Sequence, residues 1–426
     1  MAKIVLNTFG SFGDLHPYLA IAIELKRRGH QPIVATAEVY RKKIDAEGIA
    51  FAGVRPDLGE LMSQPAFLKM LWDPKRGTEY LIRDYLLPAV SQAYEDLTPV
   101  CEGADLLLTH FAAYAGPIVA EVQKIHWLSI ALQPTIFFSK FDPPVLAAAP
   151  WARHLYGLGP WVFSSMMKLG EIQTTPWIRP LLDLREKLGL PRGKNPMISG
   201  QFSPYGTLAL FSKHFAKSQP DWPANTVMTG FVSYDKLGEG FGLAPNKTEL
   251  DGFLKAGAPP VVFTLGSSAT MAAGRFFEES IMAAQKVGVR AVLLVGKTDE
   301  PPKCADGSIY ITDYAPYSEL LPRGAATVHQ GGIGTTAQAL RAGRPMIVVP
   351  WAHDQPDHAE RCRKLGVSRR VGRGKYRADS VARELGQLLN DASYAQKAKT
   401  IAQSLVAEDG LKVACDAIEA SLVSTN

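Results

Sequence analysis

The feature of this sequence that most constrains its fold is an apolar run ending in a glycine-containing turn, which occurs twice. Residues 4–8 (IVLNT) lead into Phe9-Gly10-Ser11, and residues 260–264 (PVVFT) lead into Leu265-Gly266-Ser267. In both halves further short apolar runs alternate with helical patterns, which indicates a parallel sheet. The sequence therefore predicts two doubly wound α/β domains of Rossmann-like type, facing each other across a ligand cleft at the carboxyl ends of their strands.

The segments between the turns define the expected elements and domains. The expected strands are residues 4–8, 33–36, 106–109, 127–131, 208–211, 260–264, 291–295, 309–312, 326–328 and 346–349. The helices with the clearest ends are residues 18–28, 276–287 and 336–342. Loop-type composition marks a boundary, so we expect an N-terminal domain over 1–215, a linker over 216–245, a C-terminal domain over 246–392, and final helices over 393–426 that pack back toward the N-terminal domain.

Charge and cysteine content exclude several classes of protein. The chain has 426 residues and a net charge of only +5, too weak for a dedicated nucleic-acid binder. No stretch resembles a membrane span or a signal peptide. The cysteines, Cys101, Cys304, Cys362 and Cys415, are far apart, which suggests neither a zinc site nor a disulfide framework. We expect a cytoplasmic protein without integral membrane contact; its oligomeric state is left open.

The first motif, residues 10–17 (GSFGDLHP), occupies the turn after the first expected strand. Ligands of open α/β sheets bind at such turns. The motif lacks the third glycine of G-x-G-x-x-G, and no acidic residue clearly ends the second strand to hold a ribose, which disfavours an NAD-linked oxidoreductase. Asp14 has two open interpretations: it caps the following helix, or it performs acid-base chemistry.

The second motif, residues 329–336 (HQGGIGTT), lies between an expected strand and an expected helix. Glycines allow close backbone approach, and the N–H groups at the start of a helix attract phosphate. His329, at the end of the strand, is expected to donate to a phosphate oxygen. The motif lacks the lysine of a G-x-x-x-x-G-K-[ST] loop, which disfavours ATP hydrolysis.

The third motif, residues 350–356 (PWAHDQP), is again a strand end that runs into a helix. Its adjacent carboxylate and amide, Asp354 and Gln355, suit the hydroxyl groups of a sugar. Metal ligation by the neighbouring acids and histidines competes with this interpretation, but their spacing matches no H-E-x-x-H pattern. We expect no metal and no cofactor.

These three motifs, with Tyr314-Ala315-Pro316, resemble the family 1 nucleotide-sugar glycosyltransferases of the GT-B fold over essentially the whole sequence. Within that family the sequence is most similar to bacterial members, notably flavonoid rhamnosyltransferases and the rhamnosyltransferase of rhamnolipid synthesis. Residues 71–75 (LWDPK), 221–223 (DWP) and 228–231 (MTGF) strengthen the comparison.

The resemblance implies a donor site for a nucleotide sugar in the second half of the sequence. It implies that Tyr314 stacks on the base, that the diphosphate is held by the glycine-rich motif, and that Asp354 and Gln355 contact the sugar. Plant members place a glutamate on the ribose, and here the matching position is Gln338, which favours dTDP-rhamnose over UDP-glucose. The expected donor-binding residues are Ser267, Tyr314, His329, Gly331, Gly332, Gly334, Thr335, Gln338, Asp354 and Gln355.

The resemblance also assigns the acceptor and the catalytic base to the first half. Plant members use a histidine base in the first loop, and Asp14 stands in its place here. His110 either assists Asp14 or is structural. A small apolar or phenolic acceptor is expected to meet Gly13, His16, Trp72, Phe137 and Phe138.

The sequence thus predicts an inverting, metal-independent hexosyltransferase that moves a sugar, with rhamnose favoured, onto a hydroxyl of a small aromatic acceptor such as a flavonoid. Two alternatives within the class are a UDP-glucose-dependent glucosyltransferase and a rhamnosyltransferase with a lipid acceptor. A different class is a catalytically inactive accessory protein that binds the donor only.

Overall fold

The protein forms two compact units in the computed structural model, which describes residues 1–59, 61–234, 247–267, 269–298 and 300–423. Unit 1 comprises Met1–Tyr234 and Glu408–Asn426, and unit 2 comprises Asp235–Ala407. Unit 1 thus includes residues 216–234, which were expected in the linker, and residues 393–407 belong to unit 2. Residues 235–245 of the expected linker lie outside the described residues.

Unit 1 is built on a seven-stranded parallel sheet in the order β3-β2-β1-β4-β5-β6-β7. Its strands are β1 (Lys3–Asn7), β2 (Gln31–Thr36), β3 (Ala50–Gly53), β4 (Leu106–His110), β5 (Trp127–Ala131), β6 (Thr207–Ala209) and β7 (Thr226–Met228). Its α-helices are α1 (Phe12–Arg27), α2 (Arg41–Ala46), α3 (Pro65–Leu71), α4 (Gly77–Leu81), α5 (Val90–Cys101), α6 (Ala115–Gln123), α7 (Pro160–Thr174), α8 (Arg179–Lys187) and α16 (Gly410–Val423).

Unit 2 is built on a six-stranded parallel sheet in the order β10-β9-β8-β11-β12-β13. Its strands are β8 (Val261–Thr264), β9 (Ala291–Leu294), β10 (Ile309–Thr312), β11 (Ala326–His329), β12 (Met346–Val348) and β13 (Ser368–Arg370). Its α-helices are α9 (Lys247–Lys255), α10 (Phe276–Val287), α11 (Tyr317–Leu320), α12 (Ile333–Arg341), α13 (Gln355–Lys364), α14 (Ala378–Asn390) and α15 (Ala392–Val406). Both sheets are Rossmann-like, as expected.

The strand order of each sheet reverses direction at one place. In unit 1 the chain moves outward from β1 through β2 and β3, and then returns to place β4 on the other side of β1. In unit 2 the same switch lies between β8 and β11. Crevices at such switch points, outside the carboxyl ends of the strands, are where open α/β sheets bind ligands. The fold therefore marks one candidate ligand edge in each unit.

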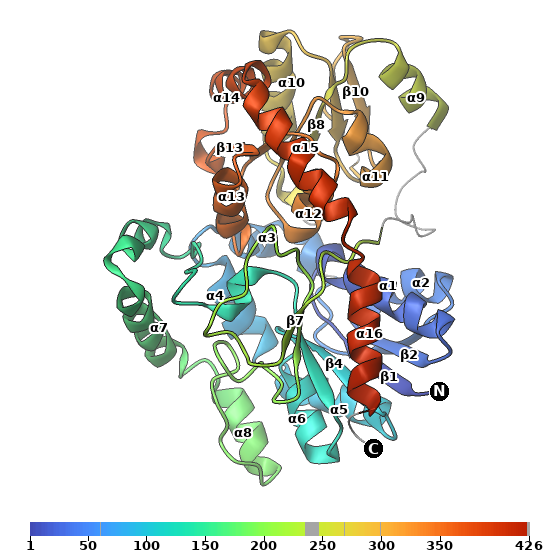
Figure 1. The fold of residues 1–426 in the computed structure, drawn as a ribbon, viewed down its shortest axis with the longest axis vertical. Coiled ribbons are helices and arrows are strands. Elements are labelled where there is room, and N and C mark those ends of the chain that lie inside the picture. The colour runs from blue at the N-terminus through green and yellow to red at the C-terminus, as the bar shows by residue number, and fades with distance from the viewer. Residues whose placement is uncertain (60, 235–246, 268, 299, 424–426) are drawn as a thin grey trace. The chain divides into compact units, whose positions relative to one another are not determined.

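The last helix packs on the first one. In unit 1, Ala414, Cys415 and Ile418 of α16 join the buried cluster that contains Leu15 and Leu19 of α1. Figure 1 shows α16 (red) alongside α1. The expected return of the C-terminal helices to the N-terminal unit therefore holds for α16, whereas α15 packs on α12 in unit 2.

Helix α1 begins at Phe12, earlier than the expected start at Tyr18. Ser11 and Asp14 form a capping box: the Ser11 side chain accepts from an amide of the first turn, and Asp14 accepts from the Ser11 backbone N–H. This cap compensates for Pro17 inside the helix, which removes a single backbone hydrogen bond. The cap places the carboxylate of Asp14 at the carboxyl edge of the sheet.

Candidate active site

The loop after β1 holds Asp14 in one orientation. Gly10 has φ +133°, and a Cβ atom there would lie 2.2 Å from Oδ2 of Asp14, so only glycine fits. Oδ2 accepts from the Ser11 backbone N–H at 2.7 Å. The Tyr40 hydroxyl donates to the Gly10 carbonyl oxygen at 2.7 Å and ties the loop to the segment after β2. One carboxylate oxygen thus belongs to the helix cap, and the other is left for chemistry.

The second carboxylate oxygen of Asp14 faces His110 at the end of β4. Oδ1 lies 3.5 Å from Nε2 of His110, with the histidine side chain 2% exposed and the aspartate side chain 23% exposed. The backbone N–H of Ala112 donates to Nδ1 of His110 at 3.3 Å, which places the proton of the neutral ring on Nε2, toward Asp14. The structure shows that Asp14 caps α1 and that its other carboxylate oxygen faces an imidazole; its acid-base role stays a prediction.

Two of the five expected acceptor residues lie in packed environments. The ring of His16 lies 5.1 Å from that of Tyr234 and 5.2 Å from that of Phe12. Burial and the nearby charge of Lys43 lower the pKa of His16 to about 3. Phe137 stacks on Trp222 at 4.1 Å, within a buried aromatic cluster of the β5–β6 region. The ring of Phe137 is part of this core, and its expected contact with an acceptor stays a prediction.

The other three differ in exposure. Trp72 ends helix α3 and is 5% exposed. Phe138 is half-buried with φ +44°, so the chain turns sharply immediately after Phe137. Gly13 lies in the first turn of α1 and is half-buried beside Asp14. Of the five, Gly13 and His16 belong to the same motif as the candidate base Asp14.

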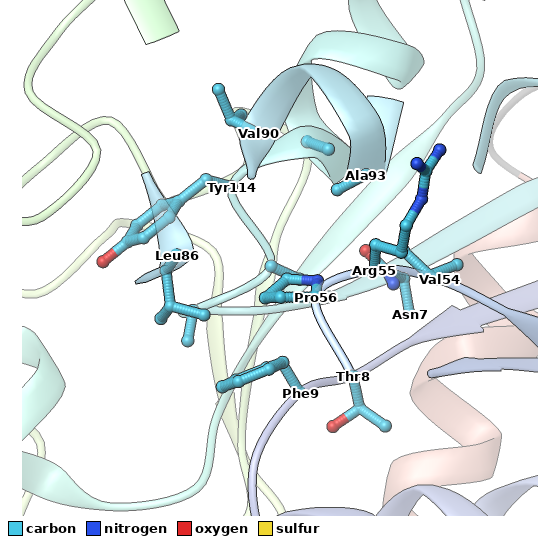
Figure 2. A pocket seen from close by; sticks show the side chains of 13 residues that line it. Asn7, Thr8, Phe9, Val54, Arg55, Pro56, Leu86, Val90, Ala93 and Tyr114 are labelled. Atoms are coloured by element: carbon cyan, nitrogen blue, oxygen red, sulfur yellow. The ribbon is translucent and has the colours of Figure 1, made fainter. Parts of the chain in front are cut away.

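A pocket lies at the carboxyl edge of the unit 1 sheet, next to this loop (Figure 2). Its empty volume is about 370 Å³, part of it open solvent. It is lined by Asn7, Thr8, Phe9, Val54, Arg55, Pro56, Leu86, Val90, Ala93, Ala112, Ala113, Tyr114 and Ala115. None of the five expected acceptor residues is among them. The lining residues come from four separate segments and carry no local motif that the sequence analysis could have used.

The pocket is mainly apolar, and its buried polar lining residues are Asn7, Thr8 and Tyr114. Figure 2 shows Phe9, Pro56 and Leu86 around its centre, with the guanidinium of Arg55 pointing away from them. Arg55 pairs instead with Asp96, at 2.7 Å. Thr8 is 3% exposed, and its Oγ1 has no hydrogen-bond partner within the described ranges. This orphaned hydroxyl suits a polar group of a bound molecule.

In unit 2 the loops after β8 and β11 meet at the switch point. Gly266 has φ +68°, and a Cβ atom there would lie 2.3 Å from Nε2 of Gln330 and 3.3 Å from Oγ1 of Thr335. Ser267 follows and is exposed. The turn at Gly266 and the glycine-rich motif after β11 therefore lie against each other. Gln330 was part of the second motif but was not among the expected site residues.

The glycine-rich loop leads into the amino terminus of α12. Gly332 is the N-cap, and no side chain caps the amides of the first turn. Those N–H groups, starting with Ile333 and Gly334, have no partner within the helix and form a site for an anion. Gln338 is half-buried, one turn beyond Gly334 on the same face of α12. The helix therefore offers amides for a diphosphate and, farther along, an amide side chain.

His329 has a different role from the one expected. It is fully buried, its Nδ1 accepts from the Gly331 backbone N–H at 3.1 Å, and its Nε2 lies 3.3 Å from the Met346 sulfur. Both ring nitrogens are thus engaged inside the unit. Its expected contact with a phosphate oxygen stays a prediction; in the structure the ring orders the backbone of the glycine-rich loop.

The buried His329 predicts acid sensitivity of unit 2. Burial, together with the charge of His358, lowers its pKa from 6.5 to about 3. Between these pH values the unfolded chain binds a proton that the folded chain does not. We expect the contribution of neutral His329 to the free energy of unfolding to be complete above pH 6.5. Below pH 6.5 the free energy of unfolding should fall by up to about 1.4 kcal/mol per pH unit. Urea melts of wild type and H329N measure the effect. Equal losses in both proteins between pH 6.5 and 4 would contradict it.

The third motif divides its two expected sugar contacts between surface and interior. Asp354, the N-cap of α13, has its side chain 22% exposed. Gln355 is 4% exposed, and its Oε1 accepts from the backbone N–H groups of Trp351 and Ala352 at 2.8 and 3.3 Å. The side-chain oxygen of Gln355 is therefore used within the turn that precedes α13. Asp354 is then the accessible polar side chain of the pair.

Tyr314 occupies the far side of the same sheet edge. It follows β10 and is half-buried. β10 and β11 are separated by β9 and β8, which corresponds to about 14 Å at the usual strand spacing. Tyr314 and the glycine-rich loop thus lie apart along one edge, as the two ends of an extended ligand require.

The residues considered for metal ligation do not converge. Asp357 pairs with Arg361 at 2.7 Å, and Nδ1 of His358 contacts the Gly331 carbonyl oxygen at 2.7 Å. Among the described residues, no group of three or more His, Cys, Asp or Glu side chains is arranged to hold a metal ion.

Loops at the switch points of two Rossmann-like units are typical of ligand-binding α/β proteins, and comparison with known proteins identifies the family. Residues 4–135 match the glycosyltransferase family 28 N-terminal domain, and residues 281–417 match the erythromycin biosynthesis protein CIII-like C-terminal domain. O-mycaminosyltylonolide 6-deoxyallosyltransferase of Streptomyces fradiae is 30% identical over 98% of this chain and 97% of its own length. The chain belongs to the family 1 glycosyltransferases of the GT-B fold.

More distant relatives and solved structures agree with this assignment. A sterol 3-beta-glucosyltransferase of Neurospora crassa is 28% identical over 98% of this chain, which spans only 27% of that protein. The glycosyltransferase of kitacinnamycin has a TM-score of 0.69 at 21% identity, covering 99% of both chains. A spinosyn rhamnosyltransferase complexed with thymidine diphosphate has a TM-score of 0.67 at 18% identity, covering 98% of this chain and 100% of its own.

These comparisons establish transfer of a sugar from a nucleotide donor as the activity. These comparisons do not confirm the narrower expectation of a flavonoid rhamnosyltransferase branch, since the two relatives are by name a 6-deoxyallosyltransferase and a sterol 3-beta-glucosyltransferase. None of the helices within the described ranges is long and apolar enough to cross a membrane.

Proposed function

We propose that the protein is an inverting, metal-independent transferase that moves a 6-deoxyhexose, with rhamnose favoured, from a dTDP donor to a hydroxyl of a small apolar or phenolic acceptor such as a flavonoid. The observation that carries the proposal is the pairing of Asp14 with His110 at the switch point of unit 1, 3.5 Å apart. One oxygen of Asp14 is held by the helix cap, so the other is directed by the fold rather than by the ligand.

In the proposed reaction Asp14 takes the proton of the acceptor hydroxyl while that oxygen attacks the anomeric carbon. The bond from this carbon to the diphosphate oxygen breaks, and the nucleoside diphosphate leaves with the bonding electrons. A carboxylate is a weaker base than a phenolate by about 6 pKa units, so proton transfer must accompany attack. Nε2 of His110 faces Oδ1 of Asp14 at 3.5 Å and makes no hydrogen bond within the described ranges, so it would serve to orient this carboxylate.

The donor would be held along the carboxyl edge of the unit 2 sheet. The first-turn amides of α12 and the hydroxyls of Ser267 and Thr335 supply donors to the diphosphate, and Tyr314 supplies a face for the base. Asp354 would meet the sugar hydroxyls. Gln338, an amide in place of a carboxylate, supports a deoxyribose donor, and the thymidine diphosphate in the spinosyn enzyme and the 6-deoxyallosyl group in the Streptomyces fradiae name point the same way.

The acceptor would enter the apolar pocket of unit 1. Phe9, Pro56, Leu86 and Tyr114 offer apolar surface, and the Thr8 hydroxyl offers one polar contact. An alternative is a UDP-glucose-dependent enzyme or one with a lipid acceptor; the sterol 3-beta-glucosyltransferase relatives favour that alternative.

The experiment that tests the proposal offers dTDP-rhamnose, dTDP-glucose and UDP-glucose, in the presence of EDTA, with a flavonol, a macrolide aglycone and a sterol. Mass spectrometry identifies the sugar transferred, and NMR gives the configuration at the anomeric carbon. We expect a rhamnoside with inverted configuration on the flavonol or the macrolide. Faster transfer of glucose from UDP-glucose, or to the sterol, would select the alternative. Binding of thymidine diphosphate without any product would indicate a donor-binding accessory protein.

A further inference from the structure

Two buried imidazoles hold the backbone of Gly331 from opposite sides. Nδ1 of His329 accepts from the Gly331 N–H at 3.1 Å, and Nδ1 of His358 donates to the Gly331 carbonyl oxygen at 2.7 Å. Both histidines are 0% exposed. Side chains from β11 and α13 thus fix both the N–H and the carbonyl oxygen of Gly331. This is unusual, because most backbone groups are paired with other backbone groups.

The position held in this way controls the start of α12. Gly331 has φ +90°, and a Cβ atom there would lie 2.8 Å from Cγ1 of Val348. The chain leaves this conformation directly into Gly332, the N-cap, and the first-turn amides follow. Any rotation of the Gly331 peptide would therefore redirect the amides proposed to bind the diphosphate.

The imidazole of His358 also reaches the third motif. Its Nε2 lies 3.6 Å from Oδ2 of Asp354, one helical turn earlier in α13. The two nitrogens of one rigid ring thus contact the glycine-rich loop and the accessible carboxylate, two segments that are distant in sequence. Because the ring is fully buried, it cannot touch a bound donor. The ring can therefore act only by setting the spacing between the glycine-rich loop and the Asp354 carboxylate, the groups proposed to contact the donor.

We propose that His358 is a positioning residue that couples the diphosphate loop to Asp354: the N–H at Nδ1 orders the loop, and in the imidazolium form the N–H at Nε2 orders the carboxylate, 3.6 Å away. The proposal rests on the donor site proposed above. Buried partners that lock the side chains of a site are what keeps them in a productive geometry. The interaction of each nitrogen with a different motif makes the two functions separable by substitution.

Replacement of His358 by asparagine or by glutamine separates these two functions. The amide nitrogen of asparagine can replace Nδ1, and that of glutamine can replace Nε2. In H358N we expect the affinity for thymidine diphosphate, measured by calorimetry, to stay within about threefold of wild type, while kcat/KM for the nucleotide sugar falls about tenfold, the usual effect of one charge-assisted hydrogen bond. In H358Q we expect the affinity for thymidine diphosphate itself to fall about tenfold.

Cys362→Ala is the matched control, because Cys362 is 0% exposed in the same helix and lies one turn beyond His358. It should retain both nucleotide affinity and turnover. Equal behaviour of H358N and H358Q, equal losses in Cys362→Ala, or unfolding of both His358 variants while the control folds would overturn the coupling role. If wild type binds neither thymidine diphosphate nor UDP, the proposed donor site fails and this inference with it; normal binding by wild type separates the two outcomes.

Discussion

Replacement of Asp14 by asparagine is expected to lower the rate of sugar transfer by about a thousandfold while leaving the affinity for thymidine diphosphate unchanged. General base catalysis contributes about 10²–10⁴-fold, and an amide cannot take the acceptor proton. The substitution should preserve the fold, because an amide oxygen can still accept from the Ser11 backbone N–H that Oδ2 now accepts from at 2.7 Å. Loss of the charge near the start of α1 should cost only about 0.5 kcal/mol.

Initial rates of product formation and calorimetric binding of thymidine diphosphate measure the two parts of this expectation. Asp105→Asn is a suitable control, since Asp105 also accepts a backbone N–H, that of Lys3 at 2.7 Å, but stands at the opposite end of the sheet from Asp14. The control should be as active as wild type. A folded D14N protein that keeps more than a tenth of the activity would remove Asp14 from the role of base.

Replacement of Gly331 by alanine is expected to weaken binding of thymidine diphosphate by at least about thirtyfold, or about 2 kcal/mol. The residue has φ +90°, and an added Cβ would lie 2.8 Å from Val348. Relief of that contact requires the peptide to rotate away from His329 and His358, which hold its N–H and carbonyl oxygen. The amides at the start of α12 would then lose their common direction.

The effect is measured by calorimetry of the alanine variant, with thermal melting as the check on folding. Gly374→Ala in the same unit serves as the control, because an added Cβ there meets no atom within 4 Å and its φ is not in the positive range. Near wild-type affinity in Gly331→Ala would show that the loop conformation does not govern nucleotide binding.

The sequence predicts the central part of both sheets and misses three of their four edge strands for a physical reason. Strands such as β1, β4 and β8 are buried on both faces and appear as continuous apolar runs. The missed strands, β3, β7 and β13, are three or four residues long, include exposed or polar positions, and lie at or near the edges of the sheets. Pairing with a neighbour, and not local pattern, makes them strands.

The candidate site is predictable where its residues are adjacent in sequence. Asp14 and the glycine-rich motif stand next to strand ends, and the parallel topology alone brings His110 beside Asp14, because β1 and β4 are neighbours. The acceptor pocket is different: Phe9, Pro56, Leu86 and Tyr114 are dispersed apolar residues that only the tertiary structure assembles. Phe137 illustrates the converse, since a large aromatic side chain after a strand is as suited to a core as to a pocket.

His329 shows why residue type alone did not define its role. A histidine beside a glycine-rich turn suggests a phosphate contact, but the ring accepts from the Gly331 N–H and packs against Met346 inside the unit. His329 is the last residue of β11. This strand is buried on both faces, so the His329 side chain points into the core. The donors proposed for the diphosphate are instead the backbone amides at the start of α12, which follow the Gly331 position held by His329 and His358.

The most direct test of the donor site is a calorimetric titration of the full wild-type protein with thymidine diphosphate and with UDP in the presence of EDTA, since it needs no knowledge of the acceptor. We predict binding of thymidine diphosphate in the micromolar range, tighter than that of UDP and unchanged when Mg²⁺ replaces EDTA. The absence of binding, or binding that requires Mg²⁺, would contradict a donor site built from the α12 amides and hydroxyl groups of unit 2.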